Sequence, residues 1–425
     1  MQSSRISVPT MMQGRASHPE SAMSITWSVG RVSGASADAG SCANGSAAIP
    51  LGCRPLLNAA SWRSPSTSVS PPPASSSTEN RQPTVNAMKG RSMKTELEFG
   101  LMLAGQFNPG VDPLTKLTEA IEQTRAARSG GFDSLWTVQH FLADLQYFQP
   151  IPLLARLAAE AGDMHLGTSV LLVPHYPPVI LAEELATLAV ITGDRLIVGA
   201  GAGYRKLEFD AIGVPMRERY GRLEESIEVL RKLWSGDQVD HRGTYYDVSG
   251  VQLRMVPPRL ERQPVWLGAT GPKGIARAAR IGDEWLATNE MTVEDLRVGQ
   301  DRYMEALPDG DSAEQRSFPV IREVLIAPST EEALALAEPA LRHKYANYAQ
   351  WGHQTRPVED LLDSAVVVGS PEHCVERLAT LIEETRCRHL ILRMQWPGSS
   401  HAAAMQSIEL FSTRVAPELR SLARP

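Results

Sequence analysis

The feature that most constrains the fold is a regular alternation, from Met93 onward, of short apolar runs with longer stretches whose apolar residues recur at helical spacing. Strands are predicted at 97–103, 134–138, 165–173, 195–203, 264–270, 284–288, 320–327 and 389–394. Helices are predicted at 114–131, 151–162, 179–193, 219–236, 273–282, 331–349, 370–385 and about 401–420. Eight such units in series favour an α/β chain folded as a closed (β/α)8 barrel over an open doubly wound sheet.

Two kinds of insertion interrupt this pattern. Residues 239–258 contain short alternating stretches and turn residues, which predicts a small β excursion. Longer connections follow several strands, and in a barrel they would gather at the mouth. We expect these mouth-loop insertions to set substrate specificity; they span 106–112, 140–150, 289–317 and 346–365.

The chain divides near residue 92. Residues 1–92 are rich in Ser, Pro, Ala and Gly, and neither a helical nor a strand period persists there. Eight Arg and Lys against three acidic residues is also a transit-peptide composition. Three accounts remain open: translation upstream of the true start, a disordered tail, or an organelle signal. We therefore predict a disordered extension at 1–92 and a barrel domain at 93–421.

Composition limits the function classes. A length of 425 residues suits one barrel with insertions, and a formal net charge of -6 gives no reason to expect a nucleic-acid partner. No apolar run approaches the roughly 20 residues of a membrane helix, so we expect a soluble chain. The four cysteines form no C-x-x-C pair, which favours a reduced, cytoplasmic setting.

Barrel enzymes carry their working residues at the carboxyl ends of the strands. Those ends contain no G-x-S-x-G elbow and no H-E-x-x-H motif, and the ten histidines do not cluster at ligand spacing, so no metal is expected. Glycines at 268, 271 and 274 lead into a predicted helix, where backbone N–H groups can approach a phosphate. Arg277 lies one turn further on. The alternative is that these glycines only make a turn.

The order of several segments resembles the bacterial luciferase-like flavin and deazaflavin oxidoreductases. The resemblance is carried by LGTSVLLVPHYPPVILAEELATLAVITGDRLIVGAGAGYRKLEFDAIG (166–213) and by its continuation at 219–246. PVWLGATGPKGIARAARIGDEWL (264–286) looks like the family's cofactor-phosphate segment, and 368–398 is similar to its closing units. The resemblance implies a TIM barrel with the cofactor ring over the carboxyl-terminal mouth.

The resemblance also implies a cis peptide bond that does not involve proline at the end of the third strand, matching Ser169–Val170 here. The bulge at Thr168, Ser169 and Val170 would support the cofactor ring from behind. Plain buried strand is the alternative for this segment. The other cofactor contacts that the resemblance implies are Gly201, Gly203, Tyr204, Gly268, Ala269, Thr270, Gly271 and Arg277.

At the end of the second strand the family usually carries an acidic residue or histidine followed by histidine, and this chain has Gln139 and His140. The resemblance makes His140 the candidate proton donor, and its ordinary pKa lies near neutrality. Gln139 departs from the pattern, because an amide can hydrogen-bond a cofactor but cannot take a proton. A structural role for His140 is the alternative.

Three functions remain open. The first is a monooxygenase that uses reduced FMN and O2 to oxidise a small organic substrate, with a separate flavin reductase as partner. The second is a dehydrogenase or reductase dependent on coenzyme F420. The third is a flavin-binding relative without turnover, which the Gln139 departure favours. A homodimer is expected because dimers are common in the family, with apolar helices at 151–161 and 179–192 as its candidate interface.

Overall fold

A computed structural model describes residues 96–258, 263–353 and 356–422; the extension predicted at 1–92 lies outside the described residues. The expected strands are all present, each within or beside its predicted range. They are β1 (Glu98–Met102), β3 (Ser134–Thr137), β5 (His165–Thr168), β7 (Leu196–Gly201), β10 (Val265–Gly268), β11 (Glu284–Leu286), β12 (Val320–Ile326) and β14 (His389–Arg393).

These strands form one curled parallel sheet in the order β11-β10-β7-β5-β3-β1-β14-β12. The first and last strands of the described residues, β1 and β14, lie side by side, with Met102 opposite Arg393. The open ends meet through a parallel bridge between Ala287, just after β11, and Val320 at the start of β12. Two backbone hydrogen bonds of 3.0 Å accompany this bridge. The sheet is therefore a closed barrel, as the sequence predicted.

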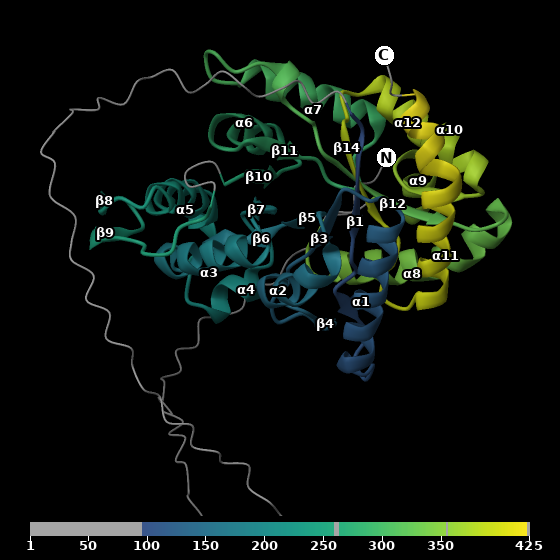
Figure 1. The fold of residues 1–425 in the computed structure, drawn as a ribbon, viewed down its shortest axis with the longest axis horizontal. Helices are drawn as coiled ribbons and strands as arrows, with labels where there is room; N and C mark the ends of the chain where they lie inside the picture. Colours follow the sequence, from purple (N-terminus) through teal and green to yellow (C-terminus); the bar gives the residue numbers. More distant parts are fainter. Residues whose placement is uncertain (1–95, 259–262, 354–355, 423–425) are drawn as a thin grey trace, which may run out of the picture. The chain divides into compact units, whose positions relative to one another are not determined.

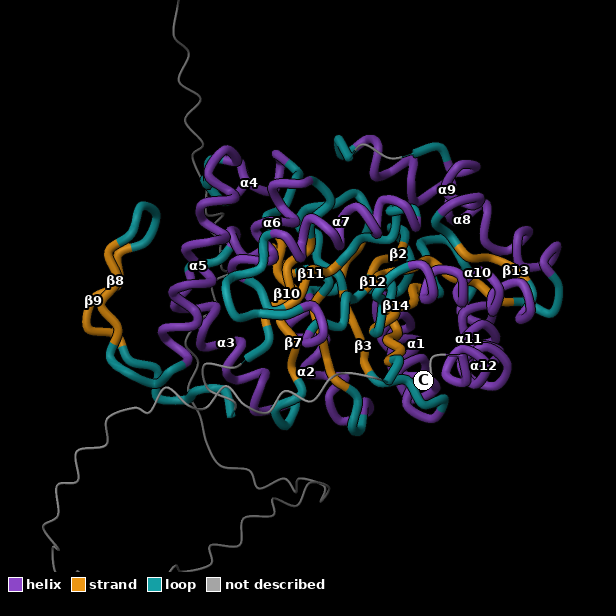
Figure 2. Tube along the Cα trace, turned by 90° about the horizontal axis from the view of Figure 1, so that it is seen from above, coloured by secondary structure: helices purple, strands orange, loops and turns teal. Residues whose placement is uncertain are grey.

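Helices follow the barrel strands and cover the outside of the sheet, as the purple segments around the orange strands in Figure 2 show. They are α1 (Pro113–Ser129), α2 (Pro150–Ala161), α3 (Pro178–Ile191), α5 (Arg219–Trp234), α6 (Pro272–Ile281), α7 (Val293–Glu305), α8 (Thr330–Gln350), α10 (Pro371–Glu384), α11 (His401–Leu410) and α12 (Ala416–Leu422). Helix α11 lies beside α1, so the two ends of the barrel sequence meet (Figure 1).

The barrel interior is a packed apolar layer rather than a channel. Its centre is a pair of indole rings, Trp136 from β3 and Trp266 from β10, whose centroids lie 5.0 Å apart. Gly167 on β5 makes room for them, because a Cβ there would lie 2.3 Å from the Trp136 ring. The imidazole of His389 closes the layer against both rings. This floor leaves ligand space only above it, at the carboxyl ends of the strands.

Two predicted mouth loops are wrong in part, because they contain helices. The stretch 289–317 holds α7, and 346–365 holds the end of α8 and the short helix α9 (Val358–Ser364). Helix α7 begins with a capping box in which Thr292 and Asp295 bond each other's backbone N–H groups. The T-x-x-D spacing was a visible signal for that helix, although its low apolar content hides the helical period.

Smaller elements decorate the barrel. The β excursion predicted at 239–258 is an antiparallel hairpin of β8 (Val239–Arg242) and β9 (Asp247–Val251) beside α5. The others are β2 (Gln106–Phe107), β4 (Gln146–Tyr147), β6 (Leu171–Leu172), β13 (Val367–Gly369) and α4 (Lys206–Ala211). Within the described residues, none of the helices has the length and apolar content needed to cross a bilayer.

Candidate functional site

A cavity of about 660 Å³ opens at the carboxyl-terminal mouth of the barrel. Side chains from the ends of several strands and from α7 and α8 line it, among them His140, Tyr204, Thr270, Glu290, Tyr348 and His353. These residues are far apart in the sequence, and the barrel brings them together because parallel strands all end at one edge. The cavity is therefore the natural place for a cofactor and substrate.

His140 is the titratable side chain deepest in this cavity. Its Nδ1 lies 3.3 Å from Oε1 of Glu208, and both side chains are buried, with exposed fractions of 10% and 1%. Burial lowers the pKa of His140, and the hydrogen bond to Glu208 partly offsets that shift. Since Glu208 occupies Nδ1, Nε2 is the nitrogen that can act on a bound molecule.

Glu208 is held firmly in place. Burial disfavours its charged form, but the hydrogen bonds from His140 and from the Phe141 backbone outweigh that effect and lower its pKa. The Phe141 N–H donates to Oε1 at 3.0 Å, and Arg205 donates to the same oxygen at 3.0 Å. The carboxylate is therefore ionised at neutral pH and fixes the orientation of the imidazole. The sequence alone did not indicate Glu208 as the partner of His140, because the contact forms only when helix α4 folds against the end of β3.

Aromatic rings cover His140 on several sides. Tyr147 and Trp351 lie 5.2 Å from it between ring centroids, and Tyr204 and Tyr348 lie 5.8 Å away. The indole N–H of Trp351 donates to Asp144, and Arg205 stacks on its ring. The end of α8 thus closes over the histidine and shields it from bulk water.

Gln139 has a different environment. Its carbonyl oxygen accepts from the backbone N–H of Leu172 at 2.7 Å. Its amide nitrogen donates to the Gln149 side chain and to the Tyr176 hydroxyl, at 3.0 and 2.5 Å. These contacts occupy the amide group and connect the ends of β3 and β6. We assign Gln139 to positioning this part of the mouth, and a direct catalytic role stays a prediction.

The bulge predicted after β5 is present. The Ser169–Val170 peptide bond is cis, as the resemblance implied. The side chain of Val170 packs against two glycines, since a Cβ at Gly201 would lie 2.4 Å from one of its methyl groups and a Cβ at Gly268 would lie 2.8 Å from the other. Thr168 lies below the bulge and donates to the Gly199 carbonyl at 2.7 Å. Three neighbouring strands thus build one shelf.

The glycines after β7 lead to a second acid–base pair. Gly203 has a φ of +75°, and Tyr204 follows it into the cavity. The Tyr204 ring lies 5.1 Å from that of His353, whose Nε2 lies 3.1 Å from Oε1 of Glu290. Burial raises the pKa of Tyr204 far above its ordinary value, so its hydroxyl is protonated at neutral pH.

Only part of the segment 268–277, which was expected to hold a phosphate, lines the cavity. Thr270 lines it, while Ala269 accepts a hydrogen bond from a buried indole and Gly271 caps α6. Arg277 is in an ion pair with Glu224 and does not line this cavity. Arg302 of the neighbouring helix α7 does line it, and within the described part of the chain its side chain forms no ion pair.

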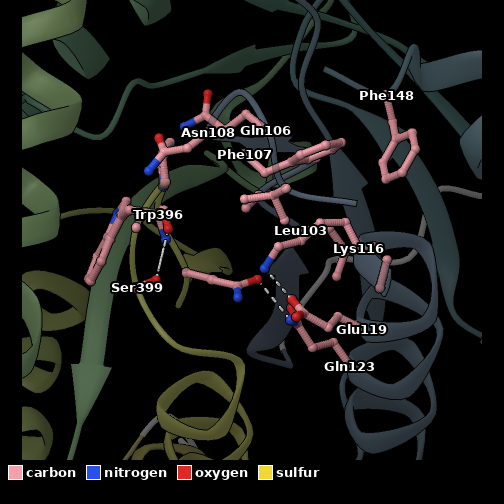
Figure 3. A pocket seen from close by; sticks show the side chains of 17 residues that line it. Leu103, Gln106, Phe107, Asn108, Lys116, Glu119, Gln123, Phe148, Trp396 and Ser399 are labelled. Atoms are coloured by element: carbon pink, nitrogen blue, oxygen red, sulfur yellow. Dashed lines mark hydrogen bonds and ion pairs between the residues drawn. The ribbon is translucent and has the colours of Figure 1, made fainter. Parts of the chain in front are cut away.

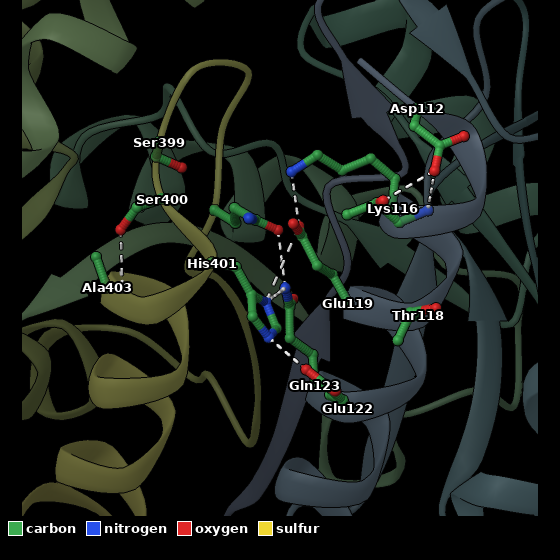
Figure 4. Close-up of polar contacts among 12 residues, drawn as sticks. Asp112, Lys116, Thr118, Glu119, Glu122, Gln123, Ser399, Ser400, His401 and Ala403 are labelled. Carbon is green, nitrogen blue, oxygen red and sulfur yellow. Dashed lines mark hydrogen bonds and ion pairs between the residues drawn. The ribbon is translucent and has the colours of Figure 1, made fainter.

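A second cavity, of about 220 Å³, lies between α1 and the connection from β14 to α11 (Figure 3). Polar side chains that line it bond one another, Lys116 with Glu119 and Gln123 with Gln395, and next to them His401 bonds Glu122. Figure 4 shows this network joining the two helices. Because these partners are already satisfied within the protein, we assign the cluster to fastening α11 onto α1.

Comparison with known proteins identifies the family. The family model for luciferase-like monooxygenases matches residues 97–389, which is more than half of the chain. Among characterised relatives, the coenzyme F420-dependent glucose-6-phosphate dehydrogenase of Nocardia farcinica is 27% identical over 353 residues, covering 77% of this chain and 99% of that protein.

Solved structures share the fold. A monooxygenase from Streptomyces bottropensis aligns with a TM-score of 0.68 at 21% identity and covers 76% of this chain and 99% of that one. The oxygenating constituent of 3,6-diketocamphane monooxygenase from Pseudomonas putida, in complex with FMN, aligns with a TM-score of 0.64 at 20% identity, covering 76% and 98%. The chain belongs to the luciferase-like monooxygenase family and is an oxidoreductase of its flavin- or coenzyme F420-dependent kind.

Proposed function

We propose that this protein is a coenzyme F420-dependent dehydrogenase or reductase that moves a hydride between the deazaflavin and a small organic alcohol or carbonyl compound. The observation that carries the proposal is the His140–Glu208 pair at the mouth of the barrel. The characterised relative from Nocardia farcinica supports the choice of cofactor, because its name specifies coenzyme F420.

The residues at the mouth fit a planar cofactor. The shelf made by Val170, Gly201 and Gly268 offers one apolar face. Two buried hydroxyl oxygens, of Ser169 and Thr288, have no hydrogen-bond partner in the described part of the chain, and a bound ring with polar edges would satisfy them. Coenzyme F420 accepts or gives a hydride when bound.

The His140–Glu208 pair is placed to accept the proton that is released together with the hydride. Alcohol oxidation removes one hydride from carbon and one proton from the hydroxyl oxygen. Burial lowers the pKa of His140, so the imidazole is neutral at pH 7 and its Nε2 can accept that proton. Glu208 at Nδ1 stabilises the imidazolium that forms. In the reverse direction the same nitrogen returns the proton to a carbonyl oxygen.

The FMN-dependent monooxygenase, which was the first function inferred from the sequence, is now the second candidate. It keeps the support of the family model's description and of the fold shared with FMN enzymes, but fold alone does not choose between cofactors. A separate flavin reductase as partner would be needed only under that reading. The aromatic cover over His140 is compatible with either chemistry.

A turnover assay with the full chain tests the proposal. The protein is mixed with coenzyme F420 and a panel of secondary alcohols and sugar phosphates, and reduction is followed as loss of the deazaflavin's visible absorbance. We expect turnover with at least one compound, and a loss of about 10²-fold or more in the His140→Gln variant. His343→Gln is the control, because that histidine lies on the exposed face of α8. Absence of turnover with every compound of this panel, and with carbonyl compounds when reduced coenzyme F420 is supplied, would refute the proposal.

A further inference from the structure

We propose that His353 and Glu290 form the outlet through which the proton taken up at His140 reaches solvent. Tyr204 lies between His140 and His353 on this route. The inference rests on the proposed function and adds a second acid–base group to it. His353 and Tyr204 face the same cavity as His140, although they come from different parts of the chain.

The first observation is that His140 has no direct route to bulk water through its own surroundings. Its side chain is 10% exposed, and its Nδ1 is directed at Glu208, which is 1% exposed. Trp351 and Tyr348 cover the imidazole on the side of α8, and Tyr147 covers it from β4. A proton accepted at Nε2 must therefore leave through the cavity before the base can act again.

The second observation is that a more exposed pair lies next to the same cavity. The side chain of His353 is 31% exposed and that of Glu290 is 15% exposed, with 3.1 Å between the paired nitrogen and oxygen. The Tyr204 ring lies 5.1 Å from His353 and 5.8 Å from His140 between centroids. Tyr204 thus adjoins both histidines, more closely than Tyr348, whose ring lies 5.8 Å from His140 and 6.2 Å from His353.

The chemistry of these groups suits a relay. Because the Tyr204 hydroxyl stays protonated at neutral pH, it can pass a proton on by accepting one and giving up another. Glu290 bonds Nε2 of His353, which leaves Nδ1 as the acceptor. In each oxidation the substrate hydroxyl proton moves to His140 and then to His353, and solvent receives it. No electron moves in this relay.

Other charged groups around the cavity set the electrostatic background of His353. Asp295 and Arg356 form an ion pair of 2.7 Å, and Glu294 and Arg302 line the wall formed by α7. Tyr348 lies 6.2 Å from the His353 ring between centroids. Asp295 and Arg356 pair with each other, and Glu290 is the carboxylate that contacts His353 directly.

The test uses the full-length protein with coenzyme F420 and a turned-over alcohol. In His353→Ala we expect kcat to fall about tenfold at low buffer concentration, with KM and cofactor affinity unchanged. Added imidazole should restore the rate, because a small diffusible base replaces the missing side chain. His343→Ala is the control and should show neither effect. An unchanged kcat in His353→Ala, or a loss that imidazole does not restore, would overturn the proposal.

A second readout needs no turnover. Imidazole nitrogen signals of the cofactor-free protein, recorded by NMR, report the hydrogen bond between His353 and Glu290 directly. Glu290→Gln should shift the Nε2 signal of His353, because a charged acceptor is replaced by a neutral amide; an unchanged signal would also overturn the proposal. Wild-type protein that fails to reduce coenzyme F420 with any substrate would refute the proposed function instead, so the two failures are distinguishable.

Discussion

Replacing Glu208 by glutamine tests the central pair of the site. Glu208 is buried and bonded by His140, Arg205 and the Phe141 N–H. Glutamine keeps an acceptor for the backbone but leaves the buried guanidinium without its counter-charge. Removing one partner of a buried ion pair costs about 3–5 kcal/mol. Arg205 keeps its bond to the Phe141 carbonyl and its stacking on Trp351, so we expect about 3 kcal/mol.

That cost is measurable by thermal unfolding. For a folded part of this size about 3 kcal/mol corresponds to a lowering of Tm by about 4 °C at pH 7. The folded-state pKa of Glu208 lies below its ordinary value of 4.5, so its contribution is present above pH 4.5 and is lost as the pH falls through the folded value. The Tm difference between wild type and variant should therefore shrink in acid.

The same variant should alter catalysis. Without the carboxylate that raises its pKa, His140 should have a still lower pKa, so the acid limb of the rate profile should move to lower pH. The maximal rate should fall about 10²-fold. Glu160→Gln is the control: this glutamate also pairs with arginine, namely Arg125 and Arg156, but on the surface, and its replacement should leave Tm and rate unchanged. An unaltered Tm and pH profile in Glu208→Gln would refute the reasoning.

Three further changes test other parts of the site. Arg302→Gln should weaken binding of a phosphate-bearing cofactor about tenfold, measured by fluorescence titration. Weaker binding in Arg277→Gln alone would instead favour Arg277, the arginine predicted from the sequence. Gly201→Ala should weaken cofactor binding about tenfold with little loss of Tm, because the new Cβ would lie 2.4 Å from Val170 and displace the shelf. An unchanged cofactor affinity would contradict the role of the shelf in binding. Lys344→Met should destabilise the fold by about 4 kcal/mol in urea unfolding, because the fully buried carboxylate of Glu323 loses its ion-pair partner. An unchanged stability would contradict the pairing.

The barrel was predictable because its evidence is local. Buried parallel strands appear as short apolar runs, and the helices between them keep a helical period. Helix α7 shows no clear helical period because most of its residues are polar, and its capping box was the signal that indicated it. Helix α9 was missed because its seven residues are too few to show a helical period.

The site was predictable only where one segment carried the signal. His140 and the bulge at Ser169 and Val170 were identified from motifs, and the cis peptide there is confirmed. The partners of His140 were not, because Glu208 and Trp351 reach it from other segments through the closure of the barrel. No spacing in the sequence records such contacts. The ion pair that engages Arg277 was hidden in the same way.

Binding of the three candidate cofactors to one preparation tests the central claim most directly. The full chain is titrated with coenzyme F420, FMN and reduced FMN, with fluorescence or absorbance as the readout. The account predicts saturable binding of coenzyme F420 at least tenfold tighter than either form of FMN, and about tenfold weaker binding of coenzyme F420 in Arg302→Gln. A preference for reduced FMN would contradict the account and restore the monooxygenase reading.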